Sequence, residues 1–306
     1  MMTLETDGAI MKKRENLTLI LAFGATLIGA SANALSKFAL QDFSPIPLAF
    51  IRHVLTAVFF LSAAIFNKIR LPKLKDIPWF LLSGFSGYAA FSLFFNLGLE
   101  TVDVSVASMI MGTFPIMTVI LAAIVFKEKI AGWSYAAVAV EFVGIIIMFA
   151  SKDFLNFNLG TALIFVSAFL LAVYNVTQKF LIKKYTPLEI CVYSILACLL
   201  MMSFYAPQSI AELSAASAPS IWAVIILGII VCGVGTLMWS AAVGRTKKLT
   251  TITNFSFLTP FLATLYGVLI LSEIPTLRTL IGGIVIIFGS FLFQYFNRKK
   301  DISVTE

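Results

Sequence analysis

The sequence predicts an all-α integral membrane protein in which ten transmembrane helices form two inverted five-helix repeats. Three observations lead to this prediction: a very apolar composition, a one-sided distribution of basic residues, and two halves that share residues at a nearly constant offset. Sixty per cent of the 306 residues are hydrophobic and only 12 per cent are charged, whereas soluble domains carry about 25 per cent charged residues. Lipid must therefore solvate much of the surface.

Ten apolar stretches are each long enough to cross a bilayer, whose hydrocarbon core requires about 20 residues of helix. Backbone groups cannot stay unpaired in hydrocarbon, so a spanning segment is either a helix or a strand of a closed barrel. Continuous rather than alternating apolar runs favour helices. The predicted spans are 17–37, 46–66, 77–99, 103–126, 131–150, 159–182, 187–206, 220–243, 250–271 and 275–296.

Lysine and arginine predict the orientation of these spans. With the N-terminus in the cytoplasm, 18 of the 22 basic residues fall in inner segments, while Lys37, Lys152 and Arg278 fall in outer ones and Arg52 lies within a span. This bias is typical of the positive-inside rule. We therefore expect a multi-pass protein of the cell (cytoplasmic) membrane with cytoplasmic tails, 1–16 and 298–306. The net charge of +7 then comes from the basic residues that orient the spans in the membrane, and no nucleic-acid partner is expected.

The second half of the chain repeats residues of the first half in the same order. The shared residues are Asn33, Lys37, Phe38, Pro45, Gly84, Pro115, Glu128 and Gly144, and their partners at offsets of 142 to 145 are Asn175, Lys179, Phe180, Pro187, Gly228, Pro260, Glu273 and Gly289. The predicted repeats are 17–150 and 159–297. Since five spans is an odd number, the second repeat enters the membrane from the opposite side. Inverted repeats are typical of transporters, whose substrate site lies near the midplane between the halves.

The repeated motif resembles that of a known family. It reads Thr113-Phe114-Pro115, then Phe126-Lys127-Glu128, then Gly144, and it recurs as Leu258-Thr259-Pro260, Leu271-Ser272-Glu273 and Gly289. With these residues the chain resembles the drug/metabolite transporter superfamily, in its EamA-like branch, over nearly all of residues 17–297. The resemblance implies a ten-helix fold and movement of small organic solutes such as amino acids, sugars, nucleotide derivatives or amphipathic drugs. It does not identify the solute, because fold does not determine substrate.

Polar and aromatic side chains within the spans are the candidates for substrate binding. A buried amide in lipid needs a partner and so faces protein or a wet cavity, while aromatic rings supply the walls of an amphipathic pocket. The candidates are Ser31, Asn33, Tyr88, Phe91, Asn96, Tyr174, Asn175, Trp239, Asn254 and Tyr266. Any single aromatic ring could instead pack against lipid or core. We expect the site between helices one, three and four and their equivalents six, eight and nine.

Three ionisable residues within spans are candidates for coupling or gating, because a charge in the membrane costs several kcal/mol. Arg52 could bind within the protein, or it could reach the outer headgroups. His53 could gate proton movement or be a hydrogen-bonded structural residue. Glu141 lies in the middle of helix five, which the resembled fold places at the periphery, away from the cavity. Pro115 and Pro260 are expected to interrupt helices four and nine at equivalent points.

Two other classes of protein, an intramembrane enzyme and a membrane scaffold, are alternatives to a transporter. Gly84-Phe85-Ser86-Gly87 matches the G-x-S-G of rhomboid proteases, but the single histidine, His53, precedes the serine instead of following it. A scaffold would need no polar cavity. The three cysteines have no metal-ligand spacing, so no metal is expected. We expect no cofactor and no enzymatic activity either. The expected partners are a small-molecule substrate and the lipid bilayer; proton coupling, and whether the protein is a monomer or a homodimer, stay open.

Overall fold

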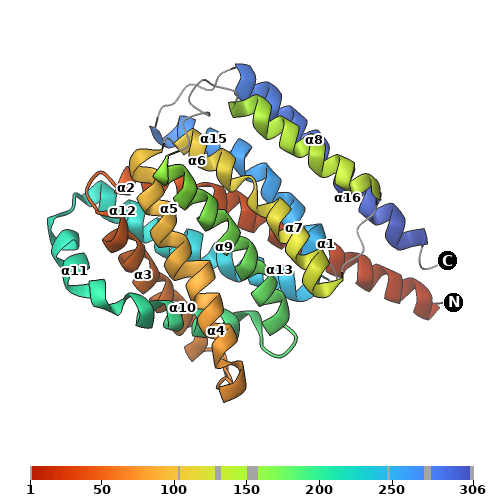
Figure 1. Cartoon of the computed structure of the whole chain (residues 1–306). Coiled ribbons are helices and arrows are strands. Elements are labelled where there is room, and N and C mark those ends of the chain that lie inside the picture. The colour runs from red at the N-terminus through yellow and green to blue at the C-terminus, as the bar shows by residue number, and fades with distance from the viewer. Residues whose placement is uncertain are drawn as a thin grey trace.

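Figure 1 shows the computed structural model of the chain, in which the described residues are 2–102, 104–127, 132–149, 158–246, 249–271 and 277–303. Within these ranges every regular element is a helix and no strand occurs. Seven helical segments are long and apolar enough to cross a membrane: Asn16–Ala39, Pro45–Ile65, Leu74–Thr101, Leu159–Leu181, Pro187–Ala215, Ala218–Arg245 and Thr251–Ile270. Three shorter apolar helices, Phe114–Phe126, Tyr135–Gly144 and Ile281–Phe293, lie in the other three predicted spans.

The spans of both halves consist of helices, some of them in several pieces. The first half contains α1 (Met2–Ala30), α2 (Ala32–Ala39), α3 (Pro45–Ile65), η1 (Leu74–Asp76), α4 (Ile77–Gly84), η2 (Phe85–Ala89), α5 (Ala90–Thr101), α6 (Val104–Met111), α7 (Phe114–Phe126) and α8 (Gly132–Phe149). The second half contains α9 (Leu159–Leu181), α10 (Pro187–Met202), η4 (Ser203–Tyr205), α11 (Ala206–Ala215), α12 (Ala218–Ile225), η5 (Ile226–Gly235), α13 (Thr236–Arg245), α14 (Leu249–Thr253), η6 (Asn254–Leu258), α15 (Thr259–Leu271) and α16 (Leu277–Ser303).

Several predicted spans consist of more than one helix. The first span is divided at Ser31, and the fourth is divided at residues 112–113. The third and eighth spans each contain a π-helical segment, η2 and η5. Hydropathy does not register such breaks, because they consist of small or apolar residues. The first helix also begins at Met2, well before the predicted start at residue 17.

Two equivalent glycines allow the halves to interlock. A Cβ atom added at Gly84 of α4 would lie 2.5 Å from the carbonyl oxygen of Ser194 in α10. A Cβ atom added at Gly228 of η5 would lie 2.8 Å from the carbonyl oxygen of Arg52 in α3. Arg52 and Ser194 are themselves related by the offset of 142. Each half therefore places its third-span glycine against the second span of the other half.

A second pair of equivalent glycines joins α8 to α16, which lie side by side at the edge of the molecule (Figure 1). A Cβ atom at Gly144 would lie 2.8 Å from the carbonyl oxygen of Gly282. A Cβ atom at Gly289 would lie 3.0 Å from the backbone nitrogen of Glu141. Small residues permit such close approach of helices in lipid, where van der Waals packing supplies much of the association energy.

Two equivalent lysines bind the C-terminal end of the third span of each half. Lys37 Nζ donates a hydrogen bond to the carbonyl oxygen of Leu99 over 2.8 Å. Its repeat partner, Lys179, donates to the carbonyl oxygens of Val243, over 3.5 Å, and of Thr246. A cation at this position satisfies carbonyl groups that the last helical turn leaves without a partner.

Polar contacts between the halves lie at both ends of α3. The first set, which we call the Asp42 cluster, consists of Asp42, Ser44, Glu212 and Ser217. The amide and hydroxyl groups of Ser44 donate to the Glu212 carboxylate, each over 2.8 Å, and those of Ser217 donate to Asp42. Hydrogen bonds from the hydroxyls of Ser217 and Ser220 hold the pKa of Asp42 below its usual value. Each carboxylate thus caps the first turn of a helix from the other half.

The second set, the Arg70 cluster, lies beyond the other end of α3 and consists of Arg70, Asp76, Lys184, Tyr185 and Glu189. The Arg70 guanidinium lies 3.3 Å from Glu189, and Lys184 lies 2.7 Å from Asp76. The Tyr185 hydroxyl donates to Asp76 over 2.8 Å. Hydrogen bonds therefore join the halves at both ends of α3, and ion pairs add to them at the Arg70 cluster.

We expect Gly228→Ala to destabilise the protein by about 1–3 kcal/mol, because the added methyl group would overlap Leu55 and the Arg52 carbonyl. Gly29→Ala is the matched control, since a Cβ atom at Gly29 meets nothing within 4 Å. Thermal unfolding of the purified variants in detergent measures the difference. Equal melting temperatures for Gly228→Ala and wild type would show that the halves do not touch there.

Candidate functional site

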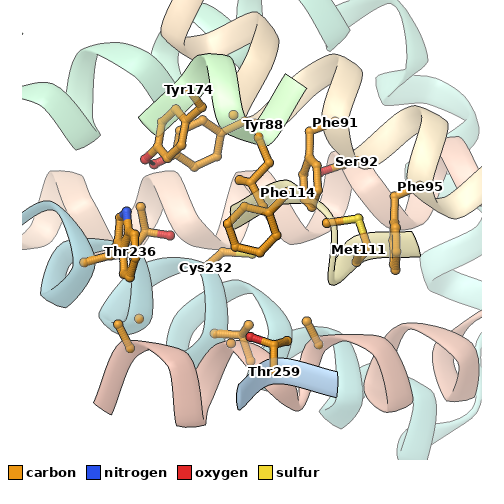
Figure 2. Close-up of a pocket in the computed structure, with 18 of the residues that line it drawn as sticks. Tyr88, Phe91, Ser92, Phe95, Met111, Phe114, Tyr174, Cys232, Thr236 and Thr259 are labelled. Carbon is orange, nitrogen blue, oxygen red and sulfur yellow. Dashed lines mark hydrogen bonds between the residues drawn. The ribbon is translucent and has the colours of Figure 1, made fainter. Parts of the chain in front are cut away.

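A cavity of about 220 Å³ lies where the helices of the two halves meet (Figure 2). Its walls come from α1, α2, α3, η2, α5, α6 and α7 of the first half, and from α9, η5, α13, η6 and α15 of the second. Pockets for drug-sized ligands have volumes of about 300–1,000 Å³. This cavity therefore has room for a small metabolite rather than a large drug.

Interrupted helices surround the cavity. Asn33 follows the break at Ser31, and Phe114 follows the break at residues 112–113. Tyr88 and Cys232 lie in the π-helical segments η2 and η5. Irregular backbone is tolerated at membrane depth only where protein buries it or where it lines a cavity. In carriers such interruptions occur next to the substrate site.

The paired asparagines both lie at the cavity and both form hydrogen bonds. Asn33 Nδ2 donates to Ser108 Oγ over 2.8 Å, within the first half. The indole nitrogen of Trp239 donates to Asn175 Oδ1 over 2.8 Å, and Asn175 Nδ2 lies 3.4 Å from Thr118 Oγ1 of the first half. Asn175 thus joins the halves across the cavity wall. A bound solute could exchange with any of these partners.

One wall of the cavity is aromatic. Figure 2 shows Tyr88 and Tyr174 with their hydroxyl groups together, and these oxygens are 3.3 Å apart. Gln178 Nε2 also donates to the Tyr174 hydroxyl. Phe91 and Phe95 stack with ring centroids 5.9 Å apart. The combination of hydroxyl groups and aromatic faces suits a solute that has a polar end and an apolar body.

Arg52 and His53 reach the cavity from the second turn of α3. Both residues are buried, with 3 and 2 per cent of their surface exposed. His53 Nε2 lies 2.8 Å from Ser92 Oγ and 3.2 Å from the Tyr88 carbonyl oxygen, so it ties α3 to the third span. The Arg52 side chain does not extend to the surface as an interfacial arginine would.

The structure brings eight of the predicted residues together at the cavity and places the others elsewhere. The residues at the cavity are Asn33, Arg52, His53, Tyr88, Phe91, Tyr174, Asn175 and Trp239. Asn96 donates to the Pro45 carbonyl oxygen over 2.9 Å and holds α5 against the start of α3. The Ser31 hydroxyl donates to the Ile28 carbonyl oxygen over 2.7 Å, which gives that carbonyl a partner at the break in the first span. Tyr266 is half-buried in α15, away from the lining.

Four further candidates also lie outside the lining. Asn254 begins η6 and is buried, and Glu141 is fully buried in α8 against Gly289 of α16. Pro115 and Pro260 are the second residues of α7 and α15, directly after the two interruptions. Glu128 and Glu273 of the repeated motif lie outside the described residues.

Sequence reasoning missed the small and weakly polar residues of the lining. They include Thr26, Ser92, Cys232, Thr236, Ser256 and Thr259, together with Met111 and Phe114. Their residue types are common on every face of a transmembrane helix, because serine, threonine and alanine serve packing as well as binding. The repeat offset could have found one of them from a predicted residue, since Tyr88 plus 144 gives Cys232 and both line the cavity. The same offset relates Ser92 to Thr236, and an offset of 145 relates Met111 to Ser256.

A cavity between two interlocked halves, with polar groups that converge on it from interrupted helices, is typical of the class of membrane transport proteins. The chain belongs to the EamA-like transporter family, which matches it twice, over residues 16–150 and 158–295. The resemblance to the drug/metabolite transporter superfamily in its EamA-like branch is thereby confirmed. The protein is an integral membrane protein of two EamA-like repeats.

Similar proteins carry transporter names. The chain is 28% identical to Uncharacterized transporter YdfC of Bacillus subtilis over 95% of this chain and 96% of that protein. It is 24% identical to a Probable terminal-alkyne amino-acid exporter of Streptantibioticus cattleyicolor, over 90% of this chain and 93% of that protein. A solved crystal structure with 17% identity superposes with a TM-score of 0.74 over 92% of this chain and 98% of that one, which supports the fold.

Proposed function

We propose that this protein is a secondary carrier that moves small organic solutes by alternating access through the cavity between its two repeats. The observation that supports this most is the equivalent placing of Gly84 and Gly228, each against the second span of the other half. Interlocked halves with equivalent contacts can adopt two near-equivalent packings, each open to one side of the membrane. The Asp42 and Arg70 clusters are then the contacts that break and reform in turn.

The proposed solute is small and amphipathic. The cavity offers amide and hydroxyl groups on Asn33, Asn175 and Tyr88, next to the aromatic faces of Phe91 and Phe95. An amino-acid-like solute fits this lining, and one relative is named for export of an amino acid. Nucleoside-like and other amphipathic metabolites are the competing solutes that the test must include.

The proposed topology has ten spans, five in each repeat, with both termini on the cytoplasmic side of the cell membrane. Seven long apolar segments and three shorter ones support the count, and the excess of lysine and arginine in alternate connections supports the orientation. The repeats would be 17–150 and 159–297. His53 and Glu141 stay candidates for proton coupling.

Alkaline phosphatase is active only outside the cytoplasm, so reporter fusions test the orientation. We expect the enzyme to be inactive when fused after Ser303 of α16 and active when fused within α11, between Ala206 and Ala215. An active fusion at Ser303 together with an inactive one in α11 would contradict the orientation.

Counterflow in proteoliposomes tests transport, with labelled amino acids, nucleosides and amphipathic cations as probes. We expect Asn175→Ala to lower the rate of counterflow at least tenfold, because Trp239 and Thr118 lose their shared partner at the cavity. Asn33→Ala should also lower it. Asn67→Ala is the matched control, since Asn67 is exposed just beyond the end of α3 and its side chain donates to the Ala63 carbonyl oxygen.

Two kinds of result would count against a carrier or against its proposed site. A protein that elutes as a single folded species and moves none of these solutes under any gradient would favour the enzyme or scaffold alternatives. Cleavage of a fluorogenic peptide by the same preparation would identify the enzyme. Unchanged counterflow in both Asn33→Ala and Asn175→Ala would remove these residues from the site.

A further inference from the structure

Arg52 is a buried cation that has no partner within the part of the chain that the structure describes. Only 3 per cent of its surface is exposed, although it lines the cavity. Its Nε and Nη2 atoms are buried without a hydrogen bond, and neither ion pair found among the described residues involves Arg52. A guanidinium carries five N–H donors, so this side chain has unused hydrogen-bonding capacity at the cavity.

An unpaired charge in this position is expensive to maintain. An arginine at the centre of a membrane helix costs about 3 kcal/mol or more, and arginines there pair with another group or line an aqueous path. Buried charges without a counterion are among the strongest destabilising features of proteins. The cost is recovered if a ligand supplies the counterion when it binds.

The second repeat provides an internal control for a structural role of Arg52. Ser194 occupies the equivalent position in α10, and its hydroxyl group donates to Ser83 Oγ over 2.8 Å. The backbone around the two residues makes the same contact, because the carbonyl oxygens of Arg52 and Ser194 face Gly228 and Gly84. The helix packing is therefore built with a serine in one repeat and an arginine in the other. The guanidinium is not needed for that packing.

The surroundings of Arg52 favour an anion. No aspartate, glutamate or lysine is among the residues that line the cavity in the described part of the chain. The titratable side chains in the lining besides Arg52 are those of His53, Tyr88, Tyr174 and Cys232. None of these carries a negative charge in its ordinary form at neutral pH. The cavity is therefore electropositive and can compensate one anionic group.

We propose that Arg52 binds the carboxylate of the transported solute, so that the cavity selects small monocarboxylates, amino acids included. Two parallel N–H groups of a guanidinium match the geometry of a carboxylate. The body of the solute then lies against Phe91, Phe95 and Phe114 (Figure 2). These three rings line the same cavity as Arg52. This assignment names the substrate class of the proposed carrier and so rests on the proposed function.

Four probes that share one aromatic body test the assignment by ligand-induced thermal stabilisation of the purified protein. They are L-phenylalanine, 3-phenylpropionate, phenylalaninamide and phenethylamine. A ligand that binds only the folded protein stabilises it by RT ln(1 + L/Kd), where L is the free ligand concentration. We expect the two carboxylates to raise the melting temperature of the wild type and the amide and the amine to leave it unchanged. Stabilisation by 3-phenylpropionate but not by L-phenylalanine would indicate that the solutes are organic acids. Stabilisation by L-phenylalanine but not by 3-phenylpropionate would indicate amino acids.

Variants at Arg52 identify the group that reads the carboxylate. Arg52→Gln should lose at least tenfold in affinity for the carboxylates, whereas Arg52→Lys should keep the preference for them at lower affinity. A folded Arg52→Gln protein that binds the carboxylates like the wild type would overturn the assignment. So would a wild type that binds neither carboxylate at 10-millimolar concentrations, or that binds phenethylamine as well as phenylpropionate.

A second variant tests the assignment without removing Arg52. Cys232 lines the same cavity as Arg52 and lies one turn beyond Gly228, which packs against the Arg52 carbonyl oxygen. Cys232→Asp places a carboxylate there permanently and should abolish binding of both carboxylate probes. Cys232→Asn is the matched control, with the same shape and no charge, and should keep most of the binding. Equal binding by the two variants would contradict the proposal.

Failure of this assignment can be told apart from failure of the carrier proposal. Counterflow of any solute that is equal in wild type and Arg52→Gln would leave a carrier whose site does not use Arg52. If carboxylate binding depends on Arg52 but the bound probe shows no counterflow, the binding site is supported and the carrier proposal fails.

Discussion

The rest of the structure depends on one constraint, which is that hydrocarbon offers no hydrogen bonds to polar groups. Regular helices satisfy their own backbone, so most of the chain is helical and apolar outside. Wherever a helix is interrupted, the exposed backbone and the polar side chains must turn toward protein or a cavity. The breaks at Ser31 and at residues 112–113, the π-helical segments η2 and η5, and the 3₁₀ segment η6 all adjoin the same cavity. The cavity and the helix interruptions therefore both follow from the same constraint.

Duplication explains which parts of the molecule are equivalent and which are not. The equivalences that concern packing are kept: Lys37 and Lys179 hold helix ends, and Gly84 and Gly228 admit the opposite half. The position of Arg52 is different, because its equivalent is Ser194. Asymmetry at a position where the backbone contacts are symmetric points to chemistry rather than to folding. A carrier needs this combination, since two similar halves supply the motion and unequal side chains supply the selectivity.

Much of the fold could be predicted from the sequence, because apolar runs and the placement of lysine and arginine directly reflect the bilayer. The repeat also led to Asn33 and Asn175, which meet the cavity from equivalent helices. The rest of the lining could not be predicted, because it depends on how each helix is rotated. Asn96 looked as suitable as Phe91, yet the π-helical segment η2 and the packing of α5 turn Asn96 toward the Pro45 carbonyl. Thr236, Ser256 and Cys232 have residue types that give no sequence signal, and only their position in the fold places them at the cavity.

The central claim is that the two halves move against each other during transport, and a reversible cross-link in the Asp42 cluster tests it most directly. Ser44 and Glu212 belong to different halves and meet through two hydrogen bonds of 2.8 Å. Ser44→Cys with Glu212→Cys, in a background with serine at the three native cysteine positions, can be joined by a short bifunctional thiol reagent that carries a reducible disulfide. If the halves move against each other, counterflow stops on cross-linking and returns on reduction, while Ser44→Cys alone keeps its activity under the same treatment. A cross-linked protein that carries solute at the full rate would contradict the account.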